Sequence, residues 1–298
     1  MSVRLPRREA LGLLAQLGLG LAASACLPTR ESPTGTGPAV QATEAPGAAF
    51  NPVLANSEIV KGHNRFAMGL IGEANRPITD ARVRFGFFQI NGQQATKRSE
   101  ADATFRWVGL EAKGMYVATA QFDAPGQWGV EVTATRPGGA PESARVLFEV
   151  REKGDAPMIG TPATRSKTET FGDVKDPSEI CSNVPPCPLH AQSLDSALAN
   201  GRPSLVVFAT PGYCVSATCA PTLGVVLKLS DQWAGRANFI HVEIYKDPRN
   251  QVLASAVTEW NLPSEPWVFL VDRSSLIADR FEGIVTPEEL EPALQAIA

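Results

Sequence analysis

The residues with the most reactive side chains are the cysteines, Cys26, Cys181, Cys187, Cys214 and Cys219. Cys214 and Cys219 follow the apolar run Ser204–Ala209, which predicts a buried strand, and they precede an expected helix. Free N–H groups and a partial positive charge at a helix start stabilise a thiolate. A thiolate can attack a disulfide, and a second nearby thiol can resolve the mixed disulfide. This pair therefore predicts thiol–disulfide chemistry.

The spacing of the pair restricts where the helix begins. Four residues separate Cys214 from Cys219, and side chains five positions apart in one helix point about 140° away from each other. The helix is therefore predicted to begin near Cys219, with Pro221 in its first turn, and Cys214 to lie in the preceding turn. A purely structural disulfide between the two cysteines stays an alternative.

The second pair, Cys181 and Cys187, encloses five residues that include two prolines. This spacing predicts a local loop disulfide. Two other interpretations stay open: exchange of Cys187 with the Cys214–Cys219 pair, or binding of copper or zinc by Cys181, Cys187 and His190. His241 falls in a predicted strand and is expected to be packed or hydrogen-bonded rather than a ligand. No cofactor is expected.

The N-terminal residues have a pattern that is typical of a targeting segment. Basic residues precede the apolar stretch Ala10–Ala23, and small residues precede Cys26. Residues 1–25 resemble a bacterial lipoprotein signal, which implies lipidation at Cys26. The pair Arg7 and Arg8 also resembles a twin-arginine signal, so the export route stays open. Residues 27–49 have almost no large apolar side chains, so residues 26–50 are predicted to be a disordered tether. We expect an extracytoplasmic protein anchored to the bacterial cell membrane, where disulfides persist.

Two folded domains are predicted beyond the tether. Residues 51–152 contain short apolar runs separated by Asn-Gly and Pro-Gly turns, as in a β-sandwich. Within them, Phe122–Trp128 resembles a hairpin of small bacterial immunoglobulin-like domains. Residues 153–180 are polar and rich in glycine and proline, which predicts a linker. Residues 181–298 alternate strand and helix.

The elements expected in residues 181–298 have the order βαβαββα after a short first helix at 194–199. The strands are predicted at 204–209, 238–244, 267–271 and 276–281, and the helices at about 219–234, at 252–260 and from Thr286 onward. In the last helix a threonine cap, a proline in the first turn and two acidic residues mark the start.

This order, the strand–turn–cysteine–helix unit and the segment Leu262–Asp272 resemble the thioredoxin superfamily. The resemblance implies a cis-proline at Pro266 that lies against the cysteine pair, with Cys214 as nucleophile and Cys219 as resolving thiol. It also implies that neighbouring backbone groups pair with an extended substrate peptide. Three features depart from the family: the four-residue spacing, Val207 at the place of a buried acid, and Glu265 beside Pro266. Glu265 and Tyr213 are expected to modulate the thiols.

The predicted fold is an all-β immunoglobulin-like sandwich followed by an α/β thioredoxin-like domain. The predicted function is a membrane-anchored thiol–disulfide oxidoreductase with protein thiols and disulfides as partners. Redox direction and oligomeric state stay open. The segment Thr210-Pro211-Gly212 also resembles the peroxiredoxin turn, so a thiol peroxidase is a second possibility. A surface binding protein or a metallochaperone is a third.

The composition argues against a nucleic-acid-binding protein and against a protein with a membrane-spanning helix. The chain has 298 residues, with 27 Lys+Arg against 31 Asp+Glu and a net charge of −4. No broad basic surface is expected, which argues against a nucleic-acid partner. No apolar run reaches the roughly 18 residues of a membrane-spanning helix.

Overall fold

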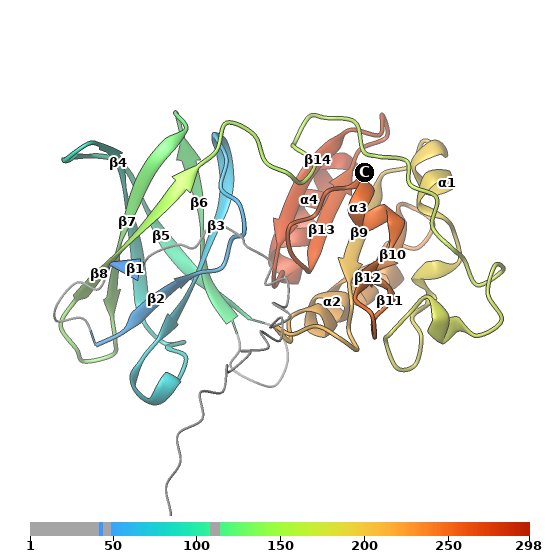
Figure 1. The fold of residues 1–298 in the computed structure, drawn as a ribbon, viewed down its shortest axis with the longest axis horizontal. Coiled ribbons are helices and arrows are strands. Elements are labelled where there is room, and N and C mark those ends of the chain that lie inside the picture. Colours follow the sequence, from blue (N-terminus) through green and yellow to red (C-terminus); the bar gives the residue numbers. More distant parts are fainter. Residues whose placement is uncertain (1–41, 44–48, 108–113) are drawn as a thin grey trace, which may run out of the picture. The chain divides into compact units, whose positions relative to one another are not determined.

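The computed structural model describes residues 42–43, 49–107 and 114–298. The predicted signal segment 1–25, the lipidation site Cys26 and nearly all of the tether lie outside these residues. The described part of the chain is mostly β, with few helices (Figure 1). None of its helices has both the length and the apolar character needed to cross a membrane.

The N-terminal β part is one antiparallel sheet of eight strands with the order β1-β8-β7-β4-β5-β6-β3-β2. Strand β5 is the longest, and it pairs with β4 along its first part and with β6 along its last part. Since β2 also lies against β8, the sheet nearly closes on itself. The bounds are β1 (Ala42–Thr43), β2 (Asn51–Leu54), β3 (Gly62–Ile71), β4 (Arg82–Asn91), β5 (Gln94–Trp107), β6 (Gly114–Phe122), β7 (Gly126–Thr135) and β8 (Glu142–Val150).

Aromatic side chains fill the inside of this sheet. Phe66 of β3 contacts Phe85 and Phe87 of β4 edge-to-face, with ring centroids 5.4 and 5.0 Å apart. The alternation predicted for β4 is present, because Val83, Phe85 and Phe87 are buried while Arg82 and Arg84 are exposed. The prediction of an immunoglobulin-like sandwich is corrected in one respect. The two halves are not separate sheets, since β5 runs continuously through both.

The C-terminal part contains a four-stranded mixed sheet with the order β10-β9-β13-β14. Strand β10 is parallel to β9, whereas β13 is antiparallel to both β9 and β14. The strands are β9 (Ser204–Ala209), β10 (Asn238–Glu243), β13 (Trp267–Val271) and β14 (Ile277–Glu282), and the helices are α1 (Leu194–Ala199), α2 (Cys219–Gln232), α3 (Ser255–Glu259) and α4 (Pro287–Ile297). A small hairpin, β11 (Tyr245–Asp247) and β12 (Val252–Leu253), lies between β10 and α3.

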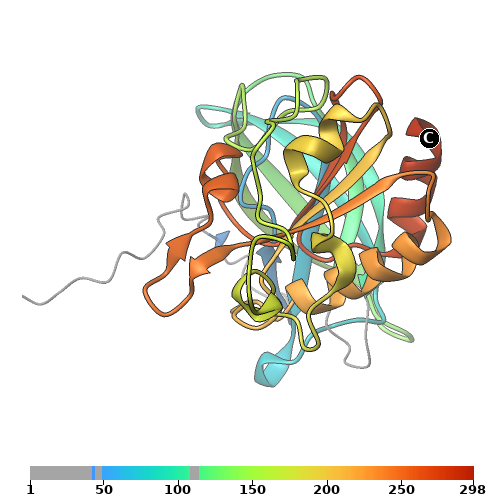
Figure 2. The same cartoon turned by 90° about the vertical axis from the view of Figure 1, so that its right-hand side faces the viewer.

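Helices cover both faces of this sheet, as the sequence of β9 requires. Every side chain of β9 is buried. Leu205, Val207 and Ala209 pack in one apolar cluster with residues of α2 and α4, whereas Val206 and Phe208 pack in another with residues of α1 and α3. Figure 2 shows α2 and α4 to the right of the strands and α3 to their left.

The segment that precedes α1, which the sequence predicts as part of a linker over 153–180, contacts the C-terminal sheet and α3. Gly160 and Thr161 exchange backbone hydrogen bonds with Ile277 of β14, and the indole of Trp260 donates to the Thr164 carbonyl at 3.1 Å. Ala156 and Ser166 are almost fully buried. We call residues 156–170 the strap.

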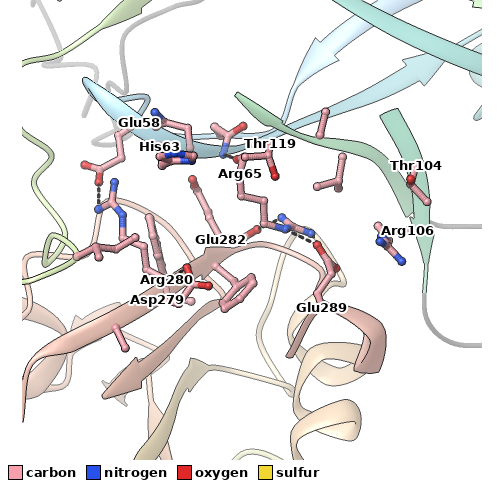
Figure 3. Close-up of a pocket in the computed structure, with 18 of the residues that line it drawn as sticks. Glu58, His63, Arg65, Thr104, Arg106, Thr119, Asp279, Arg280, Glu282 and Glu289 are labelled. Atoms are coloured by element: carbon pink, nitrogen blue, oxygen red, sulfur yellow. Dashed lines mark hydrogen bonds and ion pairs between the residues drawn. The ribbon is translucent and has the colours of Figure 1, made fainter. Parts of the chain in front are cut away.

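The two parts belong to one compact unit, Gly37–Ala298, and buried ion pairs connect them (Figure 3). Arg280 of β14 donates to Glu58 at 2.7 Å, and the Glu58 side chain is fully buried. Arg65 of β3 donates to Glu289 of α4 at 2.7 Å. Both pairs are largely removed from water, so each depends on its partner.

Candidate redox site

Cys214 lies in the middle of the turn that joins β9 to α2, and Cys219 lies where this turn ends and α2 begins. Helix α2 begins at Cys219, as the spacing predicts. Cys219 is completely buried against the C-terminal core, whereas Cys214 is half-buried. Both neighbours of Cys214 point outward, since Tyr213 is 54% exposed and Val215 is 97% exposed. The Cys214 sulfur can therefore be reached from solvent, whereas the Cys219 sulfur is covered by the surrounding residues.

The Cys214 sulfur receives several hydrogen bonds. The Cys219 backbone N–H lies 3.4 Å from it, and the Ser216 hydroxyl lies 3.2 Å from it. The hydroxyls of Ser216 and Thr218 are themselves 2.7 Å apart. The hydrogen bond from the Cys219 thiol, followed by those from Ser216 and the backbone, lowers the pKa of Cys214 to about 4. A thiolate at Cys214 follows from this arrangement.

The pKa of Cys219 is shifted in the opposite direction. Its thiol donates to Cys214 and is buried, and both effects raise the pKa of Cys219. The pair therefore holds one negative charge at Cys214 and one proton at Cys219. This is the division expected of an attacking thiolate and a thiol that acts second.

The peptide bond between Glu265 and Pro266 is cis, in agreement with the position that the resemblance implies. Burial, and then the charge on Cys214, raises the pKa of Glu265. The Glu265 charge in turn contributes to the raised pKa of Cys219. The segment before β13 thus lies within electrostatic reach of both sulfurs.

The sequence did not single out Ser216 or Tyr245, although both lie near the thiols. Ser216 bonds Cys214, and the pKa of the Tyr245 phenol is raised by burial and then by the charges of Glu265 and both cysteines. The serine could have been noticed as a hydroxyl between the two cysteines. No local signal marks Tyr245, which reaches the site only because β10 is parallel to β9.

The structure has Cys181 and Cys187 as free thiols, and the loop disulfide stays a prediction. They lie with His190 and His241 in a separate buried group. His241 was expected to be packed or hydrogen-bonded, and it is buried with Nε2 at 3.0 Å from the Ala209 carbonyl; its ring is also a member of this group. The hydroxyl of Thr210, in the turn that resembles that of the peroxiredoxins, is buried and has no hydrogen-bond partner among the described residues.

No protein-family model matches the chain, and no curated protein sequence matches it. Among solved structures, a thiol:disulfide interchange protein of the thioredoxin family from Chlorobium tepidum TLS is 16% identical, with a TM-score of 0.28, and the match covers 46% of this chain and 99% of that one. The PmoD soluble domain from Methylocystis sp. ATCC 49242 (Rockwell) is 15% identical, with a TM-score of 0.24, and the match covers 35% of this chain and 92% of that one.

Proposed function

We propose that this protein is a thiol–disulfide oxidoreductase with a thioredoxin-like C-terminal domain, in which Cys214 is the nucleophile and Cys219 the resolving thiol. The observation that carries the proposal is the asymmetric pair at the start of α2. The Cys214 sulfur is accessible and its pKa is lowered to about 4, whereas the neighbouring Cys219 thiol is buried. Sulfurs so arranged suit two-step exchange with a disulfide.

The reaction begins when the Cys214 thiolate attacks one sulfur of a substrate disulfide. A bond forms between Cys214 and that sulfur, the substrate S–S bond breaks, and the second substrate sulfur leaves as a thiolate. Cys219 then loses its proton and attacks the Cys214 sulfur, which releases the first substrate sulfur. The substrate gains two electrons and the protein dithiol becomes a disulfide; of the two protons that the substrate thiolates take up, one replaces the proton that Cys219 releases and the other comes from solvent. The same steps in reverse oxidise a substrate dithiol.

The proposed substrate is a polypeptide. Among the described residues, the backbone N–H and carbonyl of Glu265 have no hydrogen-bond partner. An extended peptide could pair with them as an added strand. The exposed Tyr213 and Val215 side chains flank Cys214 and offer apolar contact to such a peptide.

A lipid anchor at Cys26 and an extracytoplasmic location are part of this proposal. They rest on the basic and apolar residues that precede Cys26. Labelling cells with a fatty-acid analogue should mark the wild-type chain and leave Cys26→Ser unmarked. An unlabelled wild-type chain would contradict the anchor without bearing on the exchange chemistry.

The exchange is tested by trapping it. In full-length Cys219→Ser the first step proceeds and the second cannot, so incubation with a disulfide-containing polypeptide should accumulate a mixed disulfide at Cys214. Cys214→Ser is the matched control and should trap nothing. A wild-type Cys214–Cys219 disulfide with a potential below about −300 mV would mark a structural bond and refute the proposal.

A further inference from the structure

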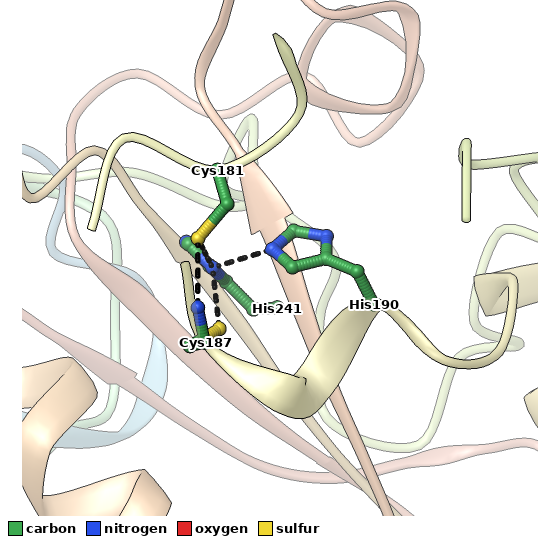
Figure 4. Close-up of side chains that lie close together, drawn as sticks. All are labelled: Cys181, Cys187, His190 and His241. Atoms are coloured by element: carbon green, nitrogen blue, oxygen red, sulfur yellow. Dashed lines mark hydrogen bonds between the residues drawn. The ribbon is translucent and has the colours of Figure 1, made fainter. Parts of the chain in front are cut away.

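Four potential metal ligands, none of them Cys214 or Cys219, converge inside the C-terminal part (Figure 4). Cys181, Cys187, His190 and His241 each place one ligand atom within 4.8 Å of the other three, and all four side chains are buried. Nδ1 of His241 lies 3.3 Å from the Cys187 sulfur, 3.8 Å from the Cys181 sulfur and 2.9 Å from Nε2 of His190. The four atoms enclose a space of the size of a single ion.

Two separate pieces of the chain build this group. His241 stands in the middle of β10, where it is paired in register with Val207 of β9. The other three come from the loop that ends in the short helix η3 (Pro188–His190), which packs against β10. Within the loop, the Cys187 N–H donates to the Cys181 sulfur at 3.3 Å. The loop is therefore folded so that both sulfurs face the strand.

A hydrogen bond fixes the orientation of His241. Its Nε2 lies 3.0 Å from the Ala209 carbonyl, which can only accept. Nε2 must therefore carry the ring proton, and the lone pair of Nδ1 is directed toward the two sulfurs and His190. A backbone carbonyl that holds the distal N–H of a histidine in this way is the usual second contact of a metal-ligating histidine.

The donor set identifies the ion. Two thiolates and two imidazoles in a closed, buried site suit tetrahedral Zn²⁺. Ordinary Zn–S and Zn–N lengths place sulfur and nitrogen about 3.6 Å apart, and two nitrogens about 3.3 Å apart, in a regular tetrahedron. The observed separations of 3.3, 3.8 and 2.9 Å fall close to these values. Only small side-chain shifts would be required.

We propose that Cys181, Cys187, His190 and His241 bind one Zn²⁺. Binding forms two Zn–S and two Zn–N bonds, and the two thiols release their protons. Since every coordination position comes from the protein, the ion has no open position and is structural rather than catalytic. Burial of all four ligands also argues against a site that hands its metal to a partner. This proposal is independent of the exchange reaction at Cys214.

The first experiment measures zinc in the purified full chain under reducing conditions. One zinc per chain is expected in the wild type and in Cys214→Ser/Cys219→Ser, which keeps four intact ligands. Cys181→Ser and His190→Ala should each weaken zinc binding at least about tenfold in competition with a chromophoric chelator. Circular dichroism of each variant shows whether it is folded.

The second experiment replaces zinc with Co²⁺ in the wild-type chain. Tetrahedral thiolate coordination should give intense visible bands and a sulfur-to-cobalt charge-transfer band, both reduced in Cys181→Ser. Three results would overturn the proposal: no zinc in the reduced wild type, loss of zinc only in Cys214→Ser/Cys219→Ser, or binding of Cu⁺ without any binding of Zn²⁺. Exchange activity need not be measured, so failure here is distinct from failure of the redox proposal.

Discussion

The backbone N–H of Gly212 donates a hydrogen bond to the hydroxyl of Ser182 at 3.0 Å. Gly212 belongs to the turn that carries Cys214, and Ser182 directly follows Cys181. The carbonyl of Ala209, at the end of β9, meanwhile accepts from His241. The loop that carries Cys181 is therefore hydrogen-bonded to the turn that carries Cys214, and a change in one of them is expected to reach the other.

Gly212→Ala tests this contact. A Cβ at position 212 would lie 2.9 Å from the Ser182 carbonyl oxygen and 3.0 Å from its Cβ, so the two backbones would have to separate. We expect a loss of about 1–3 kcal/mol in the free energy of unfolding, together with weaker zinc binding. Urea unfolding and chelator competition measure the two effects.

Gly224→Ala is the matched control, because a Cβ there meets nothing within 4 Å and Gly224 lies inside α2. It should stabilise the protein by about 0.5–1 kcal/mol. If both alanines had the same effect, the contact between Gly212 and Ser182 would be unimportant.

The reactivity of Cys214 should fall only at a pH far below the range in which an ordinary thiol loses its reactivity. With a pKa of about 4, the thiolate persists in weakly acidic solution and is lost only as the pH falls through 4. Alkylation of the reduced chain by iodoacetamide, followed by mass spectrometry, should modify Cys214 at pH 5 almost as fast as at pH 7. A rate that fell steadily below pH 8 would indicate an ordinary thiol.

The same lowered pKa makes the stability of the reduced protein depend on pH. Because the folded state holds the thiolate at a lower pKa than the unfolded chain, this contribution is complete above the ordinary value of 9.0 and is lost as the pH falls through about 4. The unfolding free energy of the wild type, compared with that of Cys214→Ser, should show an excess that grows with pH across this range.

Glu265→Gln should make the Cys214–Cys219 pair more oxidising. After burial, the charge on Cys214 raises the pKa of Glu265, so the two negative charges repel each other and the Glu265 charge disfavours the reduced, ionised form of the pair. Its removal stabilises that form, which raises the reduction potential by about 10–30 mV. Equilibration with glutathione measures the change. An unchanged or lower potential would show that Glu265 does not act on the sulfurs through its charge.

Arg280→Leu should destabilise the protein by about 3 kcal/mol, because it leaves the carboxylate of Glu58 buried without its nearest countercharge. Arg84→Ala is the control. It breaks an exposed pair with Asp102 and should cost less than about 1 kcal/mol. Equal losses in urea unfolding would contradict the importance of the buried pair.

The C-terminal elements were predictable because their signals are local. The run Ser204–Ala209 is uniformly apolar and forms a strand that is buried throughout. Thr286 forms the capping box that its position three residues before Glu289 indicates. The spacing of the cysteines placed the start of α2 at Cys219.

The features that the sequence did not reveal depend on distant contacts. Strand β5 is mostly polar and exposed, so only its pairing with β4 and β6 identifies it. His241 is separated by 51 residues from His190, and the packing of a loop against β10 brings them together. A single polar residue between Ile240 and Val242 in a buried strand was the one available signal.

The strap, residues 156–170, limits where the chain can be truncated. Cutting the chain at residue 181, where composition suggests a natural border, would remove the carbonyl that accepts from the Trp260 indole and the backbone that pairs with Ile277. The truncated piece would then expose apolar area and unpaired amides along one flank. A fragment that keeps these contacts has to start upstream of Ala156.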